Sequence, residues 1–361
     1  MTTIPNGTDL WSGGCSAVGW STEDGVHLWG RNMDFNRMAA GTAVTYLPAG
    51  TALASSEGVT APSKYAALGM GLLAVPGMPL LYEGVNDAGL MGGQLYFRGF
   101  AHYADEPRPG TAALQPPLLV GWLLGQCATV EEVARVLSDE VTLVARPLLG
   151  TVPPLHWSFS DRSGEVMVVE SDSEGLHLYR NTVGVMTNSP SYAWHRLNLL
   201  NYAGIRDLDY DTVEVCGEEL PQCFSGSGAQ GLPGDWSSPS RFIRLAMLRK
   251  YAVRGKTERQ GIARLFRIME SAAFPLGMVR VSQPGGPTEL DENVQPWDYT
   301  LYTAVYCAET GRCSWTTYDN PAIRTVTLAD LKDQTAPVQL PLETETDLKT
   351  VGFDNADGAH S

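Results

Sequence analysis

A thiol, a guanidinium and a carboxylate stand near the start of this 361-residue chain, as Cys15, Arg31 and Asp34. The thiolate is the nucleophilic form of cysteine, and a neighbouring cation such as Arg31 favours it. Taken singly, a cysteine is usually a small hydrophobe, and an arginine with an aspartate is usually an ordinary ion pair. Chemistry at these residues therefore depends on whether the fold brings the three side chains together.

The segment that carries them has the pattern of a β-hairpin. Residues 15–20 are small and β-prone, residues 23–25 (Glu-Asp-Gly) are a turn signal, and residues 26–30 form a returning strand. The returning strand runs directly into Arg31 and Asp34, which the hairpin places beside Cys15. The sequence thus predicts one cluster of thiol, guanidinium and carboxylate.

The rest of the chain alternates between hairpin patterns and paired helical patterns. Strands are predicted over residues 43–47, 155–160, 166–170, 178–180 and 182–186, and a last hairpin over 300–308 and 313–318. Helices are predicted over residues 116–126, after Thr129 with Glu132 as a capping box, over 241–250 with Ser240 as the cap, and after Thr257. Such an arrangement favours antiparallel sheets with helices on their outer faces, in the α+β class.

Composition excludes several classes of function. The chain has 25 basic and 40 acidic residues, a net charge of −15, which would repel a phosphate backbone or an anionic membrane surface. No run of eighteen apolar residues occurs, and residues 1–14 lack the basic and apolar regions of a secretory signal. We therefore expect a cytoplasmic protein without a nucleic-acid or membrane partner.

The cysteines and histidines do not predict a metal site. Six cysteines are too few and too scattered for a disulfide scaffold, and the pairs Cys216/Cys223 and Cys307/Cys313 do not have zinc-site spacing. No two of the six histidines are four residues apart, as a helical zinc motif requires. His156 and His195 each lie beside a tryptophan and are interpreted as partly buried structural residues.

A glycine pattern at residues 69–74 (Gly-Met-Gly-Leu-Leu-Ala) fits the dinucleotide-binding fingerprint, which would indicate a nucleotide-dependent oxidoreductase. Pro76, Gly77 and Pro79 follow at once and would prevent the phosphate-binding helix. A tight turn from strand to loop is the preferred interpretation, and no cofactor is expected.

Five motifs, in the family's order along the chain, make the sequence resemble the choloylglycine hydrolases, a family that includes conjugated bile salt hydrolases and penicillin V acylases. The resemblance extends from Cys15 to about residue 330. It is carried by Cys15 with the Asp24-Gly25 turn and Gly30-Arg31-Asn32-Met33-Asp34, by Lys64 to Gly71 (KYAALGMG), by Gly84 to Leu90 (GVNDAGL), by Met186-Thr187-Asn188-Ser189-Pro190, and by Leu232 to Phe242 (LPGDWSSPSRF).

The resemblance implies an αββα sandwich of the N-terminal-nucleophile hydrolases and assigns the site residue by residue. Cys15 would be the nucleophile, with Arg31 and Asp34 as its partners. Asn188 would help to hold the oxyanion. Arg241 would lie near the scissile centre, and the backbone N–H of Tyr96 would complete the oxyanion site.

The substrate is predicted to be a small molecule with an apolar acyl group on a linear amide. Glycine- or taurine-conjugated bile salts are preferred, because the similarity is family-wide and residues 275–280 resemble the substrate loop of the bile salt enzymes. Penicillin V is the alternative, because penicillin V acylases have tyrosine at the position of Tyr96, where bile salt hydrolases have asparagine. A catalytically silent binding protein of the same fold is a third interpretation.

The chemistry requires Cys15 to be the first residue, because its free α-amine would then serve as the base. We therefore expect residues 1–14 to be a propeptide, residues 15–340 a single catalytic domain, and residues 341–361 an acidic, disordered tail. Neither a metal nor an organic cofactor is needed. The resemblance also implies a homotetramer.

Overall fold

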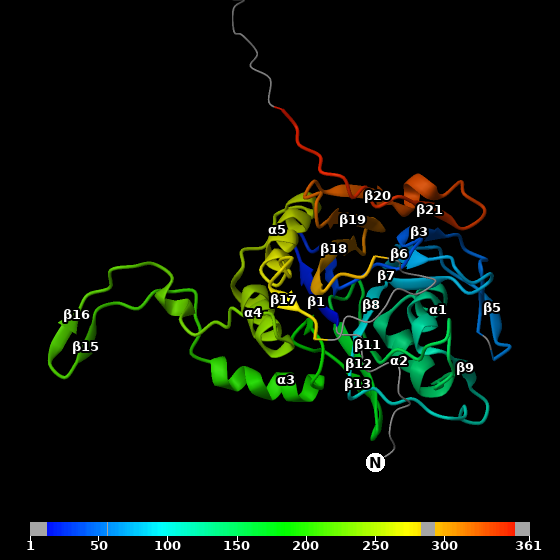
Figure 1. The fold of residues 1–361 in the computed structure, drawn as a ribbon, viewed down its shortest axis with the longest axis horizontal. Helices are drawn as coiled ribbons and strands as arrows, with labels where there is room; N and C mark the ends of the chain where they lie inside the picture. Colours follow the sequence, from blue (N-terminus) through cyan, green and yellow to red (C-terminus); the bar gives the residue numbers. More distant parts are fainter. Residues whose placement is uncertain (1–12, 56, 283–292, 351–361) are drawn as a thin grey trace, which may run out of the picture.

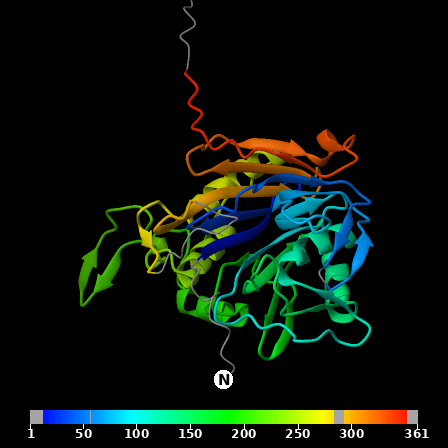
Figure 2. The same ribbon diagram turned by 45° about the vertical axis from the view of Figure 1, so that its right-hand side comes forward.

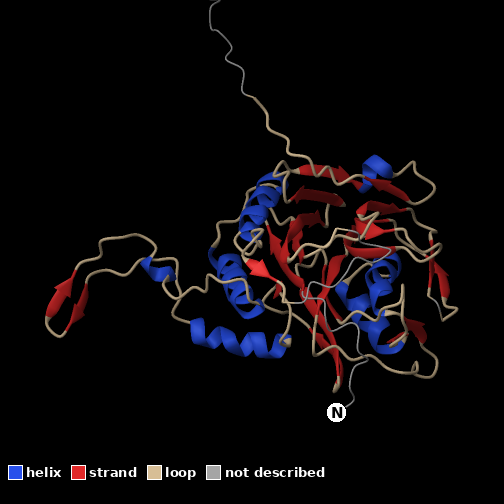
Figure 3. Cartoon of the chain, viewed as in Figure 1, coloured by secondary structure: helices blue, strands red, loops and turns tan. Residues whose placement is uncertain are grey.

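Two large antiparallel sheets lie face to face between two pairs of helices, and this packing gives a four-layer αββα sandwich (Figures 1 and 3). The computed structural model describes residues 13–55, 57–282 and 293–350. Figure 1 shows α4 (Ser238–Tyr251) and α5 (Glu258–Glu270) on one side of the sheets, and α1 (Leu119–Gln126) and α2 (Val130–Asp139) on the other. The α+β sandwich expected from the sequence is confirmed.

In the described part of the chain, the first sheet has seven strands in the order β14-β1-β2-β18-β19-β20, with β17 paired to β18. The predicted N-terminal hairpin forms the strands β1 and β2 of this sheet and is longer than expected, because β2 continues through Arg31 and Asp34. The bounds are β1 Gly13–Ser21, β2 His27–Phe35, β14 Val185–Met186, β17 Val279–Arg280, β18 Trp297–Cys307, β19 Arg312–Thr317 and β20 Arg324–Thr327.

The second sheet has eight strands over the described residues, in the order β13-β12-β11-β8-β7-β6-β3-β21. Three central strands, β6, β7 and β8, were not expected from the sequence. The bounds are β3 Ala43–Leu47, β6 Ala67–Leu72, β7 Leu80–Asn86, β8 Met91–Tyr96, β11 Leu155–Ser160, β12 Val166–Asp172, β13 Gly175–Tyr179 and β21 Val338–Leu340.

Six short strands pair outside these sheets: β4 (Ala52–Ala54) with β5 (Thr60–Pro62), β9 (Ala112–Leu114) with β10 (Val141–Leu143), and β15 (Val213–Val215) with β16 (Glu218–Leu220). A seven-residue helix, α3 (Tyr192–Asn198), follows β14. Single 3-10 turns cover Pro116–Leu118, Leu199–Tyr202, Ser227–Ala229 and Leu328–Leu331.

Side-chain caps begin two of the helices where the sequence predicts. The Thr129 side chain accepts from the N–H of Glu132 at the start of α2, and Thr257 accepts from that of Gln260 at the start of α5. The prediction that Ser240 caps α4 was wrong. The helix begins at Ser238, three residues before the predicted start, because Pro239 in its first turn needs no backbone partner.

The first four residues of the glycine pattern, 69–72, lie in strand β6, and the chain then leaves the strand for the turn at residues 75–77, in agreement with the preferred interpretation. A Cβ atom on Gly69 would lie 1.9 Å from the carbonyl oxygen of Glu83 on the neighbouring strand β7. Glycine therefore allows the two backbones to approach closely, as it does at irregular points of a sheet. No helix follows the pattern, and the dinucleotide interpretation fails.

An arm extends from the body between α3 and α4 and ends in the β15–β16 hairpin (Figures 1 and 2). Cys216 and Cys223 are exposed on this arm, whereas the other four cysteines are buried, and none of the six forms a disulfide in the described structure. Over the residues that the structure describes, no helix combines the length and the apolar character needed to cross a bilayer.

The expected disordered tail begins with residues that contact the body. Leu342 is buried, and its carbonyl oxygen accepts from the indole N–H of Trp315. Arg324 pairs with both Glu343 and Asp347. Disorder therefore does not begin at residue 341, and residues 351–361 and the segment 1–12 of the expected propeptide lie outside the described residues.

Candidate active site

The register of the β1–β2 hairpin sets the geometry around Cys15. Gly14 lies opposite Asp34, Cys15 opposite Met33, and Ala17 opposite Arg31. Arg31 Nη2 donates to Cys15 Sγ over 3.2 Å. Cys15, Arg31 and Asp34 are all buried, and the predicted cluster of thiol, guanidinium and carboxylate is present.

Opposing influences act on the thiol. Burial raises the pKa of Cys15, because the thiolate would lose its hydration, while the positive charge of Arg31 lowers it and the negative charge of Asp34 raises it. The net direction is upward, so before any chain cleavage Cys15 is held as a thiol. A base is therefore needed to generate the nucleophile.

Asp34 is an unusual carboxylate. The hydroxyl of Thr300 donates to its Oδ1, but its buried Oδ2 has no hydrogen-bond partner. Burial raises the pKa of Asp34 to about 7, and the charges of Arg241 and Arg31 together with the Thr300 bond only partly oppose that rise. A buried acceptor without a partner is rare in folded proteins, so Asp34 Oδ2 is available to accept a hydrogen bond from a further donor.

The side-chain amide of Asn188 joins three other candidate residues. Its Oδ1 accepts from the backbone N–H of Cys15 over 2.8 Å and from Arg241 Nη2 over 2.7 Å. Its Nδ2 donates to the carbonyl oxygen of Tyr96 over 3.0 Å. The structure thus joins Tyr96 to the cluster through its carbonyl oxygen.

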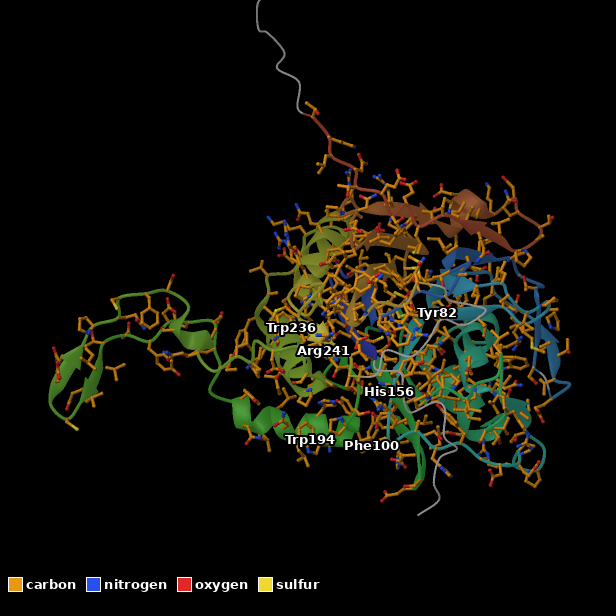
Figure 4. All side chains as sticks on the ribbon, viewed as in Figure 1. Tyr82, Phe100, His156, Trp194, Trp236 and Arg241 are labelled. Atoms are coloured by element: carbon orange, nitrogen blue, oxygen red, sulfur yellow. The ribbon has the colours of Figure 1, made fainter. Side chains whose placement is uncertain are left out.

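Arg241 enters the cluster from the first turns of α4, and Figure 4 shows it close to Trp236. Its Nε donates to the carbonyl oxygen of Trp236 over 2.8 Å, and its Nη1 donates to the carbonyl oxygen of Cys15. The guanidinium also lies 5.0 Å from the ring centre of Phe274. Arg241 therefore fixes the backbone of Cys15 and the amide of Asn188 at the same time.

Two buried histidines hold the segment that carries Asn188. His156, labelled in Figure 4, bonds the carbonyl oxygen of Thr187 through Nε2 over 2.9 Å. His195 bonds that of Asn188 through Nε2 over 2.9 Å, and burial lowers the pKa of His195 to about 4. Both histidines are structural, as expected, although they are more fully buried than the sequence indicated.

An acidic residue that was not expected lies beneath Arg31. Glu83, on β7 of the second sheet, pairs with Arg31 Nη1 and accepts from the hydroxyl of Tyr302 over 2.8 Å. Its side chain is fully buried. The feature of the sequence that could have indicated Glu83 is that it is the single acidic residue within the apolar run Leu80 to Val85 (LLYEGV).

A cavity of about 400 Å³ opens at Cys15. Its walls are mostly apolar, with Leu72, Leu80, Leu148 and Leu155 among them. The residues of chemical interest that line it are Cys15, Arg31, Asp34, Tyr82, Gln94 and Tyr96. Residues 275–280, expected as a substrate loop, do not line this cavity.

Aromatic side chains and the amide of Gln94 also form part of the cavity wall. The Tyr96 ring stacks on Phe35, with 5.7 Å between the ring centres, and the hydroxyl of Tyr82 lies 3.3 Å from that of Thr42. Gln94 is 8% exposed, and its buried Oε1 has no hydrogen-bond partner. An apolar cavity with few polar groups beside a thiol suits attack on the carbonyl of an apolar acyl compound.

Over the described residues, no group of three or more His, Cys, Asp or Glu side chains could hold a metal ion. What the site contains is a thiol, two guanidinium groups, a carboxylate and an amide. These groups suit nucleophilic attack by sulfur with stabilisation of a developing oxyanion.

Comparison with known proteins identifies relatives of this chain. The family model described as "Linear amide C-N hydrolases, choloylglycine hydrolase family" matches residues 15–338, starting at Cys15. A bile salt hydrolase/transferase of Clostridium perfringens is 31% identical over 315 residues, which span 86% of this chain and 92% of that protein.

Solved structures agree with this similarity. A variant of conjugated bile acid hydrolase from Clostridium perfringens has a TM-score of 0.83 at 29% identity, over 94% of this chain and 100% of the other. A penicillin V acylase from Agrobacterium tumefaciens has a TM-score of 0.70 at 20% identity, over 92% of this chain and 94% of the other, and shows the same fold.

Proposed function

Because the chain belongs to the choloylglycine hydrolase family of linear amide C–N hydrolases, we propose that it cleaves conjugated bile salts into the free bile acid and glycine or taurine. One observation carries the proposal. The thiol of Cys15 lines an apolar cavity while its backbone N–H is bonded to the Asn188 amide, so nucleophile and oxyanion donor meet at one point.

The nucleophile is generated by the residue itself. Removal of residues 1–14 would leave Cys15 with a free α-amine, whose ordinary pKa of about 7.7–8.0 makes it a base at neutral pH. The family match that starts at Cys15 supports this cleavage point. The amine takes the thiol proton, and the thiolate attacks the amide carbonyl of the substrate.

The oxyanion that forms is held by the amide of Asn188. Its Nδ2 has two hydrogens, and only one of them is needed for the bond to Tyr96. Arg241 keeps the amide in this orientation by donating to Oδ1. Loss of one such donor typically costs about 3–4 kcal/mol of transition-state stabilisation. The protonated α-amine gives its proton to the leaving nitrogen, and the C–N bond breaks to release glycine or taurine and leave the bile acid as a thioester on Cys15. The free amine then takes a proton from water, whose oxygen attacks the thioester and releases the bile acid with the thiol of Cys15 restored.

The cavity supports a bile acid as the acyl group. Its volume of about 400 Å³ and its leucine-rich walls suit a bulky aliphatic ring system. Gln94 supports an acyl group that carries hydroxyls. Its buried Oε1 has no hydrogen-bond partner, which costs free energy, and a hydroxyl of the substrate would remove this cost by donating to it. A phenoxyacetyl group has no hydroxyl to offer.

Penicillin V is the second candidate, and Tyr96 favours it. Its ring stacks on Phe35 inside the cavity, and this pair offers an aromatic face to an aryl acyl group. A catalytically silent binding protein is the third candidate, and it would require that Cys15 never becomes an N-terminus.

One assay decides between the candidates. Glycocholate, taurocholate and penicillin V are compared on one preparation, with the released amine measured, for the wild type and for Gln94→Leu. We expect faster release from the bile salts, and a smaller advantage in the variant. Faster release from penicillin V would overturn the bile salt assignment, and no release from any amide would favour the binding protein.

We further propose that the protein is a cytoplasmic homotetramer in which the arm contacts a second copy of this chain. The arm exposes apolar side chains along its length: Leu208, Tyr210, Val213, Val215, Leu220 and Phe224. Contiguous exposed apolar residues usually mark an interface. Light scattering on the wild type and on Val213→Ser/Val215→Ser tests this, and an unchanged mass in the variant would contradict it.

A further inference from the structure

Glu83 connects the second sheet to the nucleophile in the first. It lies on β7, and both of its carboxylate oxygens are engaged by residues of the opposite sheet. Oε2 accepts from Arg31 on β2, and Oε1 accepts from the hydroxyl of Tyr302 on β18. Glu83 does not line the cavity, so it would not touch a substrate bound there.

The planar guanidinium of Arg31 transmits this contact to Cys15. Nη1 is held by Glu83, and Nη2 lies 3.2 Å from Cys15 Sγ and 3.1 Å from Met33 Sδ. A guanidinium is rigid, so fixing one terminal nitrogen fixes the direction of the other. Removing the carboxylate would leave the direction of Nη2 without its main restraint.

The titratable groups that face Glu83 are one cation and several neutral side chains. Arg31 is the cation, Tyr302 and Tyr306 approach from β18, Tyr82 is its neighbour on β7, and Cys313 approaches from β19. Burial raises the pKa of Glu83, and the bonds from Arg31, Tyr302 and Tyr306 oppose that rise. A buried carboxylate and guanidinium in contact form an ion pair whose charges largely cancel.

We propose that Glu83 is a positioning residue for the hydrolysis: it aims Arg31 at Cys15 Sγ and offsets the charge of Arg31 at the nucleophile. The inference rests on Cys15 being the nucleophile, as proposed above. With the offset in place, Arg31 alone does not ionise the thiol, and the proton stays available for transfer to the α-amine. Glu83 therefore sets how readily Cys15 ionises, without contacting the substrate.

The sign of the effect makes the proposal testable. The isosteric Glu83→Gln removes the negative charge and keeps an oxygen that can accept from Arg31. The uncompensated cation then favours the thiolate, and the pH midpoint of Cys15 alkylation should fall by about one pH unit. The acid limb of the kcat/KM profile should move in the same direction, with KM little changed, because Glu83 is outside the cavity.

The experiment measures iodoacetamide alkylation of each cysteine against pH, by peptide mass spectrometry, on the protein with its N-terminus determined. The exposed Cys216 on the arm is an internal control whose midpoint should be the same in both proteins. Glu165→Gln removes the same charge from the surface pair with Arg180 and should shift neither cysteine. If Glu83 had only a structural role, Glu83→Gln would lower the free energy of unfolding and leave the alkylation midpoint of Cys15 unchanged. An unchanged or raised Cys15 midpoint would therefore overturn the proposal.

If Glu83→Gln does not fold, Tyr302→Phe removes one donor from the carboxylate and leaves every formal charge in place. With one donor fewer, the carboxylate of Glu83 is less readily ionised and offsets less of the charge of Arg31. The alkylation midpoint of Cys15 should therefore fall, by less than in Glu83→Gln, and an unchanged midpoint would count against the proposal. The failure of the proposed function would look different. In that case Cys15→Ser would retain hydrolysis, whereas the alkylation midpoints would still report on Glu83.

Discussion

Asn188 Oδ1 accepts a hydrogen bond from the backbone nitrogen of Cys15 over 2.8 Å, although the two residues are 173 positions apart. The same nitrogen would become the α-amine once residues 1–14 are removed. The amine would therefore be generated already bonded to the side chain that we propose as the oxyanion donor, and no rearrangement of the strands would be needed. Chain cleavage and catalysis are thus predicted to share one set of contacts.

The mature protein is expected to begin at Cys15. Gly14 packs beneath Phe274, where an added Cβ would lie 2.4 Å from the ring, so Gly14→Ala should displace the Gly14–Cys15 peptide bond and slow its cleavage. Intact mass measures the loss of fourteen residues. Cys15→Ala should retain them, and Gly204→Ala, at a glycine with open space around it, should mature normally. An active protein that still carries Met1 would contradict this prediction.

Cys15→Ser and Asn188→Ala should both lose most of the hydrolytic activity. Serine ionises far less readily than cysteine, and Asn188→Ala removes a donor whose loss lowers kcat by about 10²–10³-fold. Asn188→Ala also leaves the Cys15 N–H and Arg241 without their acceptor, so its free energy of unfolding should fall by about 1–3 kcal/mol. Asn201→Ala on the surface serves as the control. Full turnover by Asn188→Ala would exclude it as the oxyanion donor.

Tyr96→Asn should shift the ratio of kcat/KM values toward bile salts by up to roughly tenfold, which corresponds to about 1.4 kcal/mol. The change removes a ring that stacks on Phe35 in the cavity and that would favour an aryl acyl group. The backbone carbonyl that holds Asn188 remains, so turnover of the better substrate should persist. Tyr96→Phe keeps the ring and should keep the ratio. A ratio that stays constant in Tyr96→Asn would make Tyr96 a wall residue only.

Stability should depend on pH through Asp34. Its folded-state pKa of about 7 lies above the ordinary 3.8, so the folded protein binds the proton more tightly than the unfolded chain. The free energy of unfolding should therefore fall by about 4 kcal/mol as pH rises from about 3 to 8, and Asp34→Asn should lack this fall.

Urea unfolding of the wild type and of Asp34→Asn across that pH range measures the difference. His195, whose pKa of about 4 lies below its ordinary value, acts in the opposite direction, because stability is lost as pH falls from about 6.5 toward 4. That contribution is common to both proteins and cancels in the comparison. Parallel pH profiles for the two proteins would contradict the assignment to Asp34.

The structural elements that the sequence predicted correctly are those that local pattern controls. The hairpin that joins Cys15 to Arg31 and Asp34 follows from a turn signal between two β-prone runs, and the caps at Thr129 and Thr257 follow from single side chains. The α+β class follows from the order of hairpins and helices. In each case the controlling interaction lies within a few residues of the position predicted.

What the sequence did not predict depends on contacts between distant strands. Strands β6, β7 and β8 are almost fully buried, so they lack the alternation of apolar and polar residues that identifies a strand. The contact of Glu83 with Arg31 was not predicted, because strand β7 was not predicted and because Arg31 lies in the other sheet. The bond from Asn188 to the carbonyl oxygen of Tyr96 likewise requires the folded chain.

The placement of the site on the chain has a consequence for how the protein can be altered by recombination. Cys15, Arg31 and Asp34 all come from the single hairpin of β1 and β2, whereas Tyr82, Gln94 and Tyr96 come from the separate hairpin of β7 and β8. An exchange of residues 80–97 between homologous genes would replace Leu80, Tyr82, Gln94 and Tyr96 in the cavity wall and leave Cys15, Arg31 and Asp34 unchanged. The exchange would, however, also replace Glu83. A chimera made to alter substrate choice would therefore also change the residue that pairs with Arg31.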